Sequence, residues 1–246
     1  MLLEICANSY QSAINAQEAG AHRIELCSEL ALGGITPSYG LLEKVMQELT
    51  IPVFVLIRPR SGDFTYTDTE FDIMLRDIAQ CKRLGVHGIV SGVLQLQLQQ
   101  GFTIDTERTQ ELIKACGDMQ FTFHRAFDWI SNPLEGLETL VALGVDRILT
   151  SGQEKTAAVG LETLKKLHKQ ADGRITILPG GGINPTNIGA FIQAGFDEVH
   201  ASASSYHKHV KGKLPMENID AITTGIQSYS DPEKIRQLLT AITANR

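Results

Sequence analysis

The stretch Phe121-Thr-Phe-His-Arg-Ala-Phe-Asp128 begins as an apolar strand and ends in three polar side chains, those of His124, Arg125 and Asp128. A helix start at Asn132-Pro133 follows shortly after it. Parallel α/β proteins present their active groups in this way, on an apolar strand that becomes polar at its carboxyl end just before a helix. We therefore treat this stretch as one strand–helix unit and ask whether the chain repeats it.

The chain repeats the unit around a recurring glycine. In each copy a glycine follows a helical run, and a β-branched residue comes four positions later; the glycines are Gly20, Gly85, Gly144 and Gly195. Glycine supplies the left-handed conformation that ends a helix, and β-branched residues favour a strand. The glycines lie 65, 59 and 51 residues apart, which leaves room for two strand–helix units of roughly 30 residues each.

Eight strands alternating with eight helices are expected from this pattern. The strands are placed at 2–6, 23–27, 52–57, 88–91, 120–124, 147–151, 174–178 and 198–202. The helices are placed at 9–19, 39–49, 69–84, 106–115, 133–143, 156–171 and 185–194, with a last one from Ser230-Asp231-Pro232. Such alternation over about 250 residues predicts an α/β fold, a single (β/α)8 TIM barrel. We expect one domain over 1–246, with long loops at 92–105 and 204–229 and a C-terminal helix at 230–246.

Composition narrows the class of protein. The 246 residues are 43% hydrophobic and 20% charged, with a net charge of −6, which gives no electrostatic reason to expect nucleic acid or an anionic membrane as partner. No apolar run approaches the roughly 18 residues of a membrane-spanning helix. The N-terminus carries an acid at its fourth residue and lacks the basic start of a signal peptide. These features favour a cytoplasmic protein, in which cysteines are free thiols, ligands or core residues.

Charged residues occur at several predicted strand ends. Glu4 and Glu25 are placed toward the barrel interior, because a carboxylate under the outer helices would be costly without a partner. Arg58 and His124 end the third and fifth strands at the same rim. One interpretation is a buried ion pair, such as Glu25 with Arg58. The other is an enzyme site for a small anionic substrate, with candidate catalytic residues Glu25, Arg58, His124 and Asp128, in which His124 or Glu25 is the acid or base and Arg58 clamps the anion.

A glycine-rich loop, Pro179-Gly-Gly-Gly-Ile183, follows the seventh strand and precedes a helix. Backbone N–H groups converge on anions in such loops, and barrels often bind phosphate with the loops after strands seven and eight. We therefore consider Gly180, Gly181 and Gly182, with Ser202 from the next loop, as an anion-binding site. A tight turn without a ligand remains the alternative.

Cys6 and Cys27 end the first and second strands. Adjacent strands lie about 4.8 Å apart, so thiols at one level are able to share a soft ion such as Cu(I) or zinc. Free cysteine is also a common buried core residue, and no CxxC-type metal signature is present. Both interpretations stay open from spacing alone. Cys81 and Cys116 fall on helices and are interpreted as packing residues.

Several ordered motifs resemble the CutC family. They are Glu4-Ile-Cys6, Arg23-Ile-Glu-Leu-Cys27, Gly33-Gly-Ile-Thr-Pro-Ser38, Ile57-Arg-Pro-Arg60 with Asp63-Phe64, Thr122-Phe-His-Arg-Ala-Phe-Asp128, Leu149-Thr-Ser-Gly152 and Pro179-Gly-Gly-Gly-Ile183. The likeness runs from Met1 to about Ser204 and fades over the loop to Tyr229, which looks specific to this protein. Departures from the family pattern are Ser61, within the usual Arg-Gly-Gly-Asp, and the glutamine run Gln95–Gln100.

The resemblance implies a cytoplasmic TIM barrel, usually a homo-oligomer, linked by its name to copper homeostasis. The Cu(I)-binding thiols proposed for the family fall on Cys6 and Cys27. Our expectation is therefore a copper-homeostasis protein that binds Cu(I) through this cysteine pair at the barrel mouth. The alternative is a barrel enzyme acting on a small anionic substrate, such as a phosphorylated one.

Overall fold

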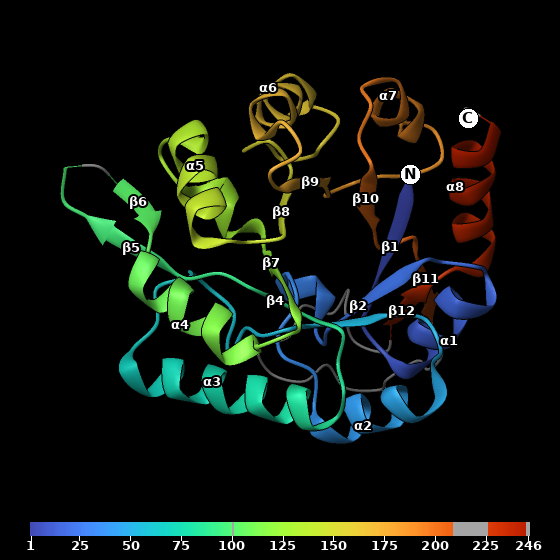
Figure 1. Ribbon diagram of the computed structural model, residues 1–246. Coiled ribbons are helices and arrows are strands. Elements are labelled where there is room, and N and C mark those ends of the chain that lie inside the picture. The colour runs from blue at the N-terminus through green and yellow to red at the C-terminus, as the bar shows by residue number, and fades with distance from the viewer. Residues whose placement is uncertain (100, 209–225, 245–246) are drawn as a thin grey trace.

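The computed structural model describes residues 1–99, 101–208 and 226–244. Its central element is a parallel sheet of eight strands in the order β10-β1-β2-β3-β4-β7-β8-β9 (Figure 1). The strands are β1 (Leu2–Ala7), β2 (Arg23–Leu26), β3 (Val53–Leu56), β4 (Gly88–Ser91), β7 (Gln120–Phe123), β8 (Arg147–Thr150), β9 (Thr176–Pro179) and β10 (Glu198–Ala201). Apart from β10, which pairs with β1, the order follows the chain, as expected when each strand is followed by a helix that returns to the sheet.

The sheet closes between β9 and β10. Seven of the eight seams are ladders of paired residues, whereas β9 and β10 meet through a single parallel bridge, Gly180 to His200. Pro179, the last residue of β9, has no N–H to donate, so the ladder cannot be built in the usual way there. The predicted (β/α)8 barrel is confirmed, with one seam weaker than the rest.

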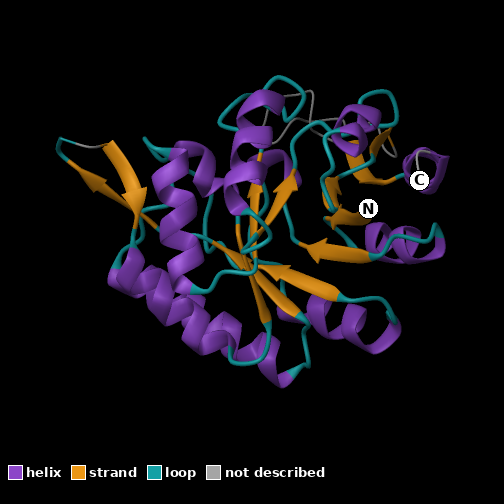
Figure 2. Ribbon diagram, turned by 45° about the horizontal axis from the view of Figure 1, so that its top comes forward, coloured by secondary structure: helices purple, strands orange, loops and turns teal. Residues whose placement is uncertain are grey.

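Helices surround the ring of strands (Figure 2). Most begin at a residue whose side chain accepts a hydrogen bond from the first turn: Ser9, Ser38, Thr67, Asp105 and Asn132 are such N-caps, and Thr67 forms a capping box with Glu70. The helices are α1 (Tyr10–Glu18), α2 (Tyr39–Glu48), α3 (Asp68–Arg83), α4 (Thr106–Cys116), α5 (Pro133–Leu143), α6 (Leu161–Ala171), α7 (Ile188–Gln193) and α8 (Pro232–Ala244). Two short 3-10 turns, η1 (Leu30–Leu32) and η2 (Arg125–Trp129), follow β2 and β7.

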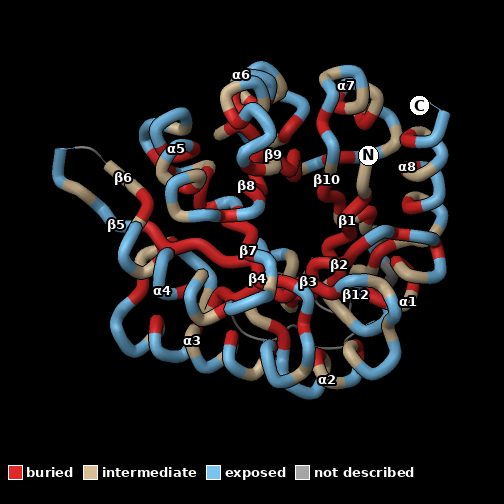
Figure 3. Tube along the Cα trace, viewed as in Figure 1, coloured by how far each residue is buried: buried red, intermediate tan, exposed pale blue. Residues whose placement is uncertain are grey.

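The strands are buried on both faces (Figure 3). In β3, Val53 and Val55 belong to the large apolar core under the helices, whereas Phe54 and Leu56 belong to a smaller interior cluster with Cys6 and Cys27. This alternation explains why the strand appears in the sequence as a continuous apolar run. It also places every second residue of each strand inside the barrel.

The structure differs from the expected elements in four places. The loop at 92–105 contains an antiparallel hairpin, β5 (Leu94–Gln97) and β6 (Gly101–Ile104), and the ends of the loop at 204–229 pair as β11 (Ser204–Lys208) and β12 (Ile226–Ser230). Residues 209–225 lie outside the described part of the chain. α6 and α7 begin five and three residues later than expected. Before α7, the Asn184 side chain accepts from the Thr186 backbone N–H and forms a turn instead of a helix start.

None of the helices in the described residues is both long enough and apolar enough to cross a membrane.

Candidate functional site

A cavity of about 330 Å³ opens at the carboxyl ends of the strands. Its lining includes the side chains of Cys6, Glu25, Cys27, Arg58, His124, His200 and Ser202, together with Gly181 and Gly182. A larger cavity of about 670 Å³ lies at the opposite, amino-terminal end. Active sites of this fold lie at the carboxyl-terminal face, and the chemically reactive side chains gather there in this chain, so the smaller cavity is the candidate site.

The two predicted thiols meet in this cavity. The Sγ atoms of Cys6 and Cys27 are 3.6 Å apart, and both residues are buried. They do not sit at one level of the sheet, because Cys6 is opposite Glu25 in the register and Cys27 is two residues further along. The diagonal arrangement nevertheless brings the sulfurs into contact. The hydrogen bond with Cys27, together with burial, raises the pKa of the Cys6 thiol well above its ordinary value.

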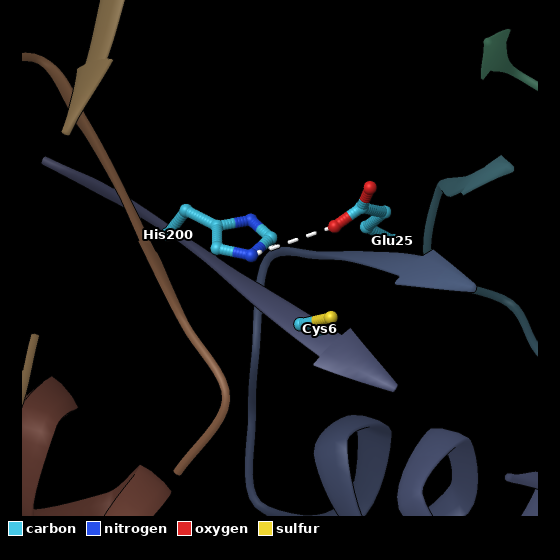
Figure 4. Close-up of side chains that lie close together, drawn as sticks. All are labelled: Cys6, Glu25 and His200. Atoms are coloured by element: carbon cyan, nitrogen blue, oxygen red, sulfur yellow. Dashed lines mark ion pairs between the residues drawn. The ribbon is translucent and has the colours of Figure 1, made fainter. Parts of the chain in front are cut away.

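A histidine and two glutamates extend from the thiols toward the barrel centre. His200 lies between the two carboxylates. Its Nδ1 is 2.7 Å from Glu4 Oε1. Its Nε2 is 3.4 Å from Glu25 Oε2, the ion pair that Figure 4 marks beside Cys6. The Cys6 sulfur, a Glu25 oxygen and a His200 nitrogen all lie within 4.8 Å of one another. These three groups come from three adjacent strands, β2, β1 and β10, and form a possible set of metal ligands.

Burial and neighbouring charges have opposite effects on the pKa values of Glu4, Glu25 and His200. Burial raises the pKa of Glu25 to about 7. Burial acts in the same direction on Glu4, but the Arg23 charge and the His200 hydrogen bond outweigh it and lower that pKa to about 2. For His200, burial lowers the pKa, yet the hydrogen bond to Glu4 and the carboxylate charges win and raise it. The surroundings thus favour the protonated form of both Glu25 and His200, which face each other and titrate as an interacting pair.

A network of ion pairs lies below this group, toward the amino ends of the strands. Arg23 binds Glu4 at 2.5 Å and Glu198 at 2.6 Å, and Arg147 binds Glu198 at 3.0 Å. Both guanidinium groups stack on the Phe54 ring, at 4.5 and 5.2 Å from its centre. Part of the interior charge is thus a structural network that holds Glu4, and through it His200, in place.

Arg58 takes no part in that network. Its guanidinium donates to the carbonyls of Leu32 (3.0 Å), Gly34 (2.9 Å) and Gly62 (2.8 Å). Its Nε finds no hydrogen-bond partner among the described residues. The suggested ion pair of Glu25 with Arg58 is wrong, because main-chain oxygens of the loop after β2 and of the loop after β3 bind the guanidinium instead.

His124 is buried at the end of β7 with one ring nitrogen used. Its Nδ1 accepts a hydrogen bond of 3.2 Å from the Ala126 N–H, so the proton of the neutral ring sits on Nε2, which has no partner among the described residues. Burial, helped by the Arg58 charge, lowers its pKa to about 3. Gly92 makes room for the ring, because a Cβ there would lie 2.7 Å from Nδ1.

Of the remaining predicted residues, some line the cavity and others hold the surrounding loops and strands in place. Asp128 does not line the cavity; it accepts from the Ser151 and Gln153 N–H groups, both at 3.1 Å, and so fixes the loop after β8. Gly180 is part of the seam and donates to Thr150, whereas Gly181, Gly182 and Ser202 line the cavity. Glu25, Arg58 and His124 share it, and catalysis by them stays a prediction.

His200 is the site residue that sequence reasoning did not single out. Its signal was the alternation in Glu198-Val-His-Ala201, which places Glu198 and His200 on the interior face. That pattern shows that the His200 side chain points to the interior, but only the closure of the barrel brings β10 beside β1.

Comparisons with known proteins agree with the expected family. The CutC family model matches residues 1–205. The copper homeostasis protein cutC homolog of Homo sapiens is 47% identical over 205 residues, which cover 83% of this chain and 74% of the human protein. A CutC family protein of Glaesserella parasuis is 41% identical over 246 residues, 97% of this chain and 98% of that protein. This last match extends through 204–229, so the view that the segment is specific to this protein is wrong.

A solved structure supports the same conclusion. The crystal structure of a CutC protein from Streptococcus agalactiae superposes with a TM-score of 0.76 and 36% sequence identity, covering 82% of this chain and 98% of that one. The motifs, the barrel and these relatives together place the chain in the CutC family.

Proposed function

We propose that this protein binds Cu(I) through Cys6 and Cys27 and serves copper homeostasis. The observation that carries the proposal is the contact of the two buried sulfurs, 3.6 Å apart, in a cavity at the carboxyl ends of the strands. Thiolates are the ligands that select Cu(I). The names of the human and mouse relatives, copper homeostasis protein cutC homologs, support the same role.

The sulfur spacing favours a bent site with a third ligand. With a metal–sulfur bond of about 2.3 Å, as in zinc thiolates, sulfurs 3.6 Å apart would subtend about 100° at a shared ion. A linear two-sulfur site would need a wider gap. A third donor would come from His200, whose ring nitrogen lies within 4.8 Å of the Cys6 sulfur in a group that does not include Cys27. Its Nδ1 is held by Glu4 at 2.7 Å, and metal-binding histidines are typically oriented by such a carboxylate.

Protons compete with the metal at this site. Cu(I) binding requires thiolates and a neutral imidazole, whereas the surroundings raise the pKa values of both Cys6 and His200. Affinity should therefore rise with pH, with proton release on binding. We further propose that the protein works in the cytoplasm, where thiols stay reduced, as a homo-oligomer.

The test is an anaerobic Cu(I) competition titration of the reduced protein. We expect one tight site, lost in the Cys6→Ser, Cys27→Ser double variant and weakened in His200→Gln. A Cys81→Ser, Cys116→Ser double variant is the matched control, since these buried thiols lie on α3 and α4 and do not line the cavity. Unchanged binding in the first double variant would remove copper from this site.

A further inference from the structure

Arg58 carries a buried positive charge that no described carboxylate balances. Only 5% of the residue is exposed, and its three acceptors, on Leu32, Gly34 and Gly62, are neutral carbonyl oxygens. The Tyr66 phenol nearby does not supply the missing charge, because burial raises its pKa to about 12. Buried charges in proteins are normally paired. Arg58 lines the mouth cavity, so the counter-charge can come from a ligand there.

A second donor without a partner lies beside it. The His124 Nε2–H has no acceptor among the described residues, and water cannot replace one easily because only 4% of the residue is exposed. The Phe64 ring touches both groups: its centre is 5.0 Å from Arg58 Cζ and 4.9 Å from the His124 ring centre. A buried N–H without an acceptor is costly, so two adjacent orphaned donors in one cavity point to an acceptor that enters from outside.

The glycine loop forms another part of the same cavity wall. Gly181 and Gly182 have φ angles of +104° and +78°, which L side chains rarely adopt, and both line the cavity. Within the described chain the Gly182 N–H donates to no acceptor, whereas Gly181 follows the residue that forms the bridge to His200. Arg125 lies against Gly181, its guanidinium carbon 3.5 Å from the position of a Cβ there. Successive glycine N–H groups near a cation are a typical anion-binding arrangement.

We infer that the mouth cavity binds a small organic anion, a carboxylate or phosphate ester, held by the Arg58 guanidinium and the His124 Nε2–H, with the Gly181–Gly182 loop as a further donor. The cavity volume of about 330 Å³ fits one small metabolite. His124 acts as a neutral donor, and Arg58 supplies the charge. The site needs no copper, so it stands or falls separately from the proposed metal function.

The test is thermal unfolding of the reduced, metal-free protein with inorganic phosphate or succinate at constant ionic strength, set with NaCl. We expect Tm to rise with at least one probe, and the stronger probe identifies the head group. Arg58→Met should abolish the rise, and His124→Leu should weaken apparent affinity at least tenfold. Arg60→Met is the matched control, because Arg60 pairs with Glu70 outside the cavity lining and should respond like the parent.

Three results would overturn the inference: no rise with either probe, an equal rise with NaCl alone, or an unchanged response in His124→Leu. His124→Leu keeps Arg58 and its carbonyl contacts, so it decides the matter even when Arg58→Met does not fold. The Cys6→Ser, Cys27→Ser protein should keep the response to the anion. This result separates the anion site from the copper site.

Discussion

The buried, neutral state of His124 makes the stability of the protein depend on pH in a way that one substitution removes. In the folded protein its pKa is about 3, against an ordinary value of 6.5. The unfolded chain therefore binds a proton that the folded chain refuses. Stability from this group is fully present above pH 6.5 and is lost as the pH falls toward 3.

The magnitude follows from the two pKa values. Between pH 7 and pH 5 the unfolded histidine becomes almost fully protonated, whereas buried His124 stays neutral. This difference should cost about 2 kcal/mol of unfolding free energy. The figure depends little on the folded value, provided that this lies well below 5.

The assay is urea denaturation at pH 5, 6 and 7 for the parent protein and His124→Gln. We expect the parent to lose about 2 kcal/mol more than the variant over this range, while any constant effect of the substitution cancels. Thr122→Val is the matched control, because it alters a neighbouring interior side chain on the same strand, β7, without removing a titrating group. Parallel pH curves for the parent and His124→Gln would refute the reasoning.

Three further outcomes are expected from unfolding measurements. Glu25→Gln should lose less stability than the parent between pH 5 and 9, by on the order of 3 kcal/mol. Burial raises the pKa of folded Glu25 to about 7, so the folded parent must give up this proton above pH 7. An unchanged pH profile would contradict this prediction. Arg23→Met should cost about 3–5 kcal/mol, because it removes the guanidinium partner of the buried Glu4 carboxylate and leaves that carboxylate with His200 alone. A second substitution, Glu4→Gln, should recover part of the loss; a cost below about 1 kcal/mol would show that the pair is weak. Gly88→Ala should cost about 1–3 kcal/mol by overpacking, since a Cβ there would lie 2.6 Å from a phenyl ring on β3, whereas Gly40→Ala, in open space, should be neutral or stabilising.

The barrel could be predicted because its signals are local. A glycine that ends a helix and a β-branched residue four positions later are read within one short segment, as at Gly20 and Gly144, and both take positive φ angles of +93° and +77°. The hairpin at 94–104 was missed although Leu94-Gln-Leu-Gln97 alternates, because the run is short and polar. The late starts of α6 and α7 were missed because the side chains of Thr156 and Asn184 accept from nearby backbone N–H groups and form turns that compete with the first helical turn.

The sequence allowed us to predict which residues lie in the site better than which of them contact one another. The cost of burying a lone carboxylate pointed Glu25 to the interior, and the strand-end position pointed Arg58 to the rim; both line the cavity together with Cys6. Neither argument could show that the loop after β2 would cap Arg58 with carbonyl oxygens, or that Glu25 would instead face His200 from the far end of the chain. Such pairings depend on the closure of the ring, which joins strands separated by more than 170 residues.

The incomplete ladder between β9 and β10 gives the barrel a mechanical asymmetry. Separating this seam breaks one main-chain bridge, whereas the seams on either side of β1 are each held by four residue pairs. The ring of strands should therefore open at this seam before any other pair of strands separates. The weak seam lies at Gly180 and His200, beside the Gly181–Gly182 loop. Local opening of the barrel should therefore be greatest at this part of the cavity wall. An occupant slightly larger than the resting cavity would be accommodated there, while the strands that carry Cys6 and Cys27 keep their register.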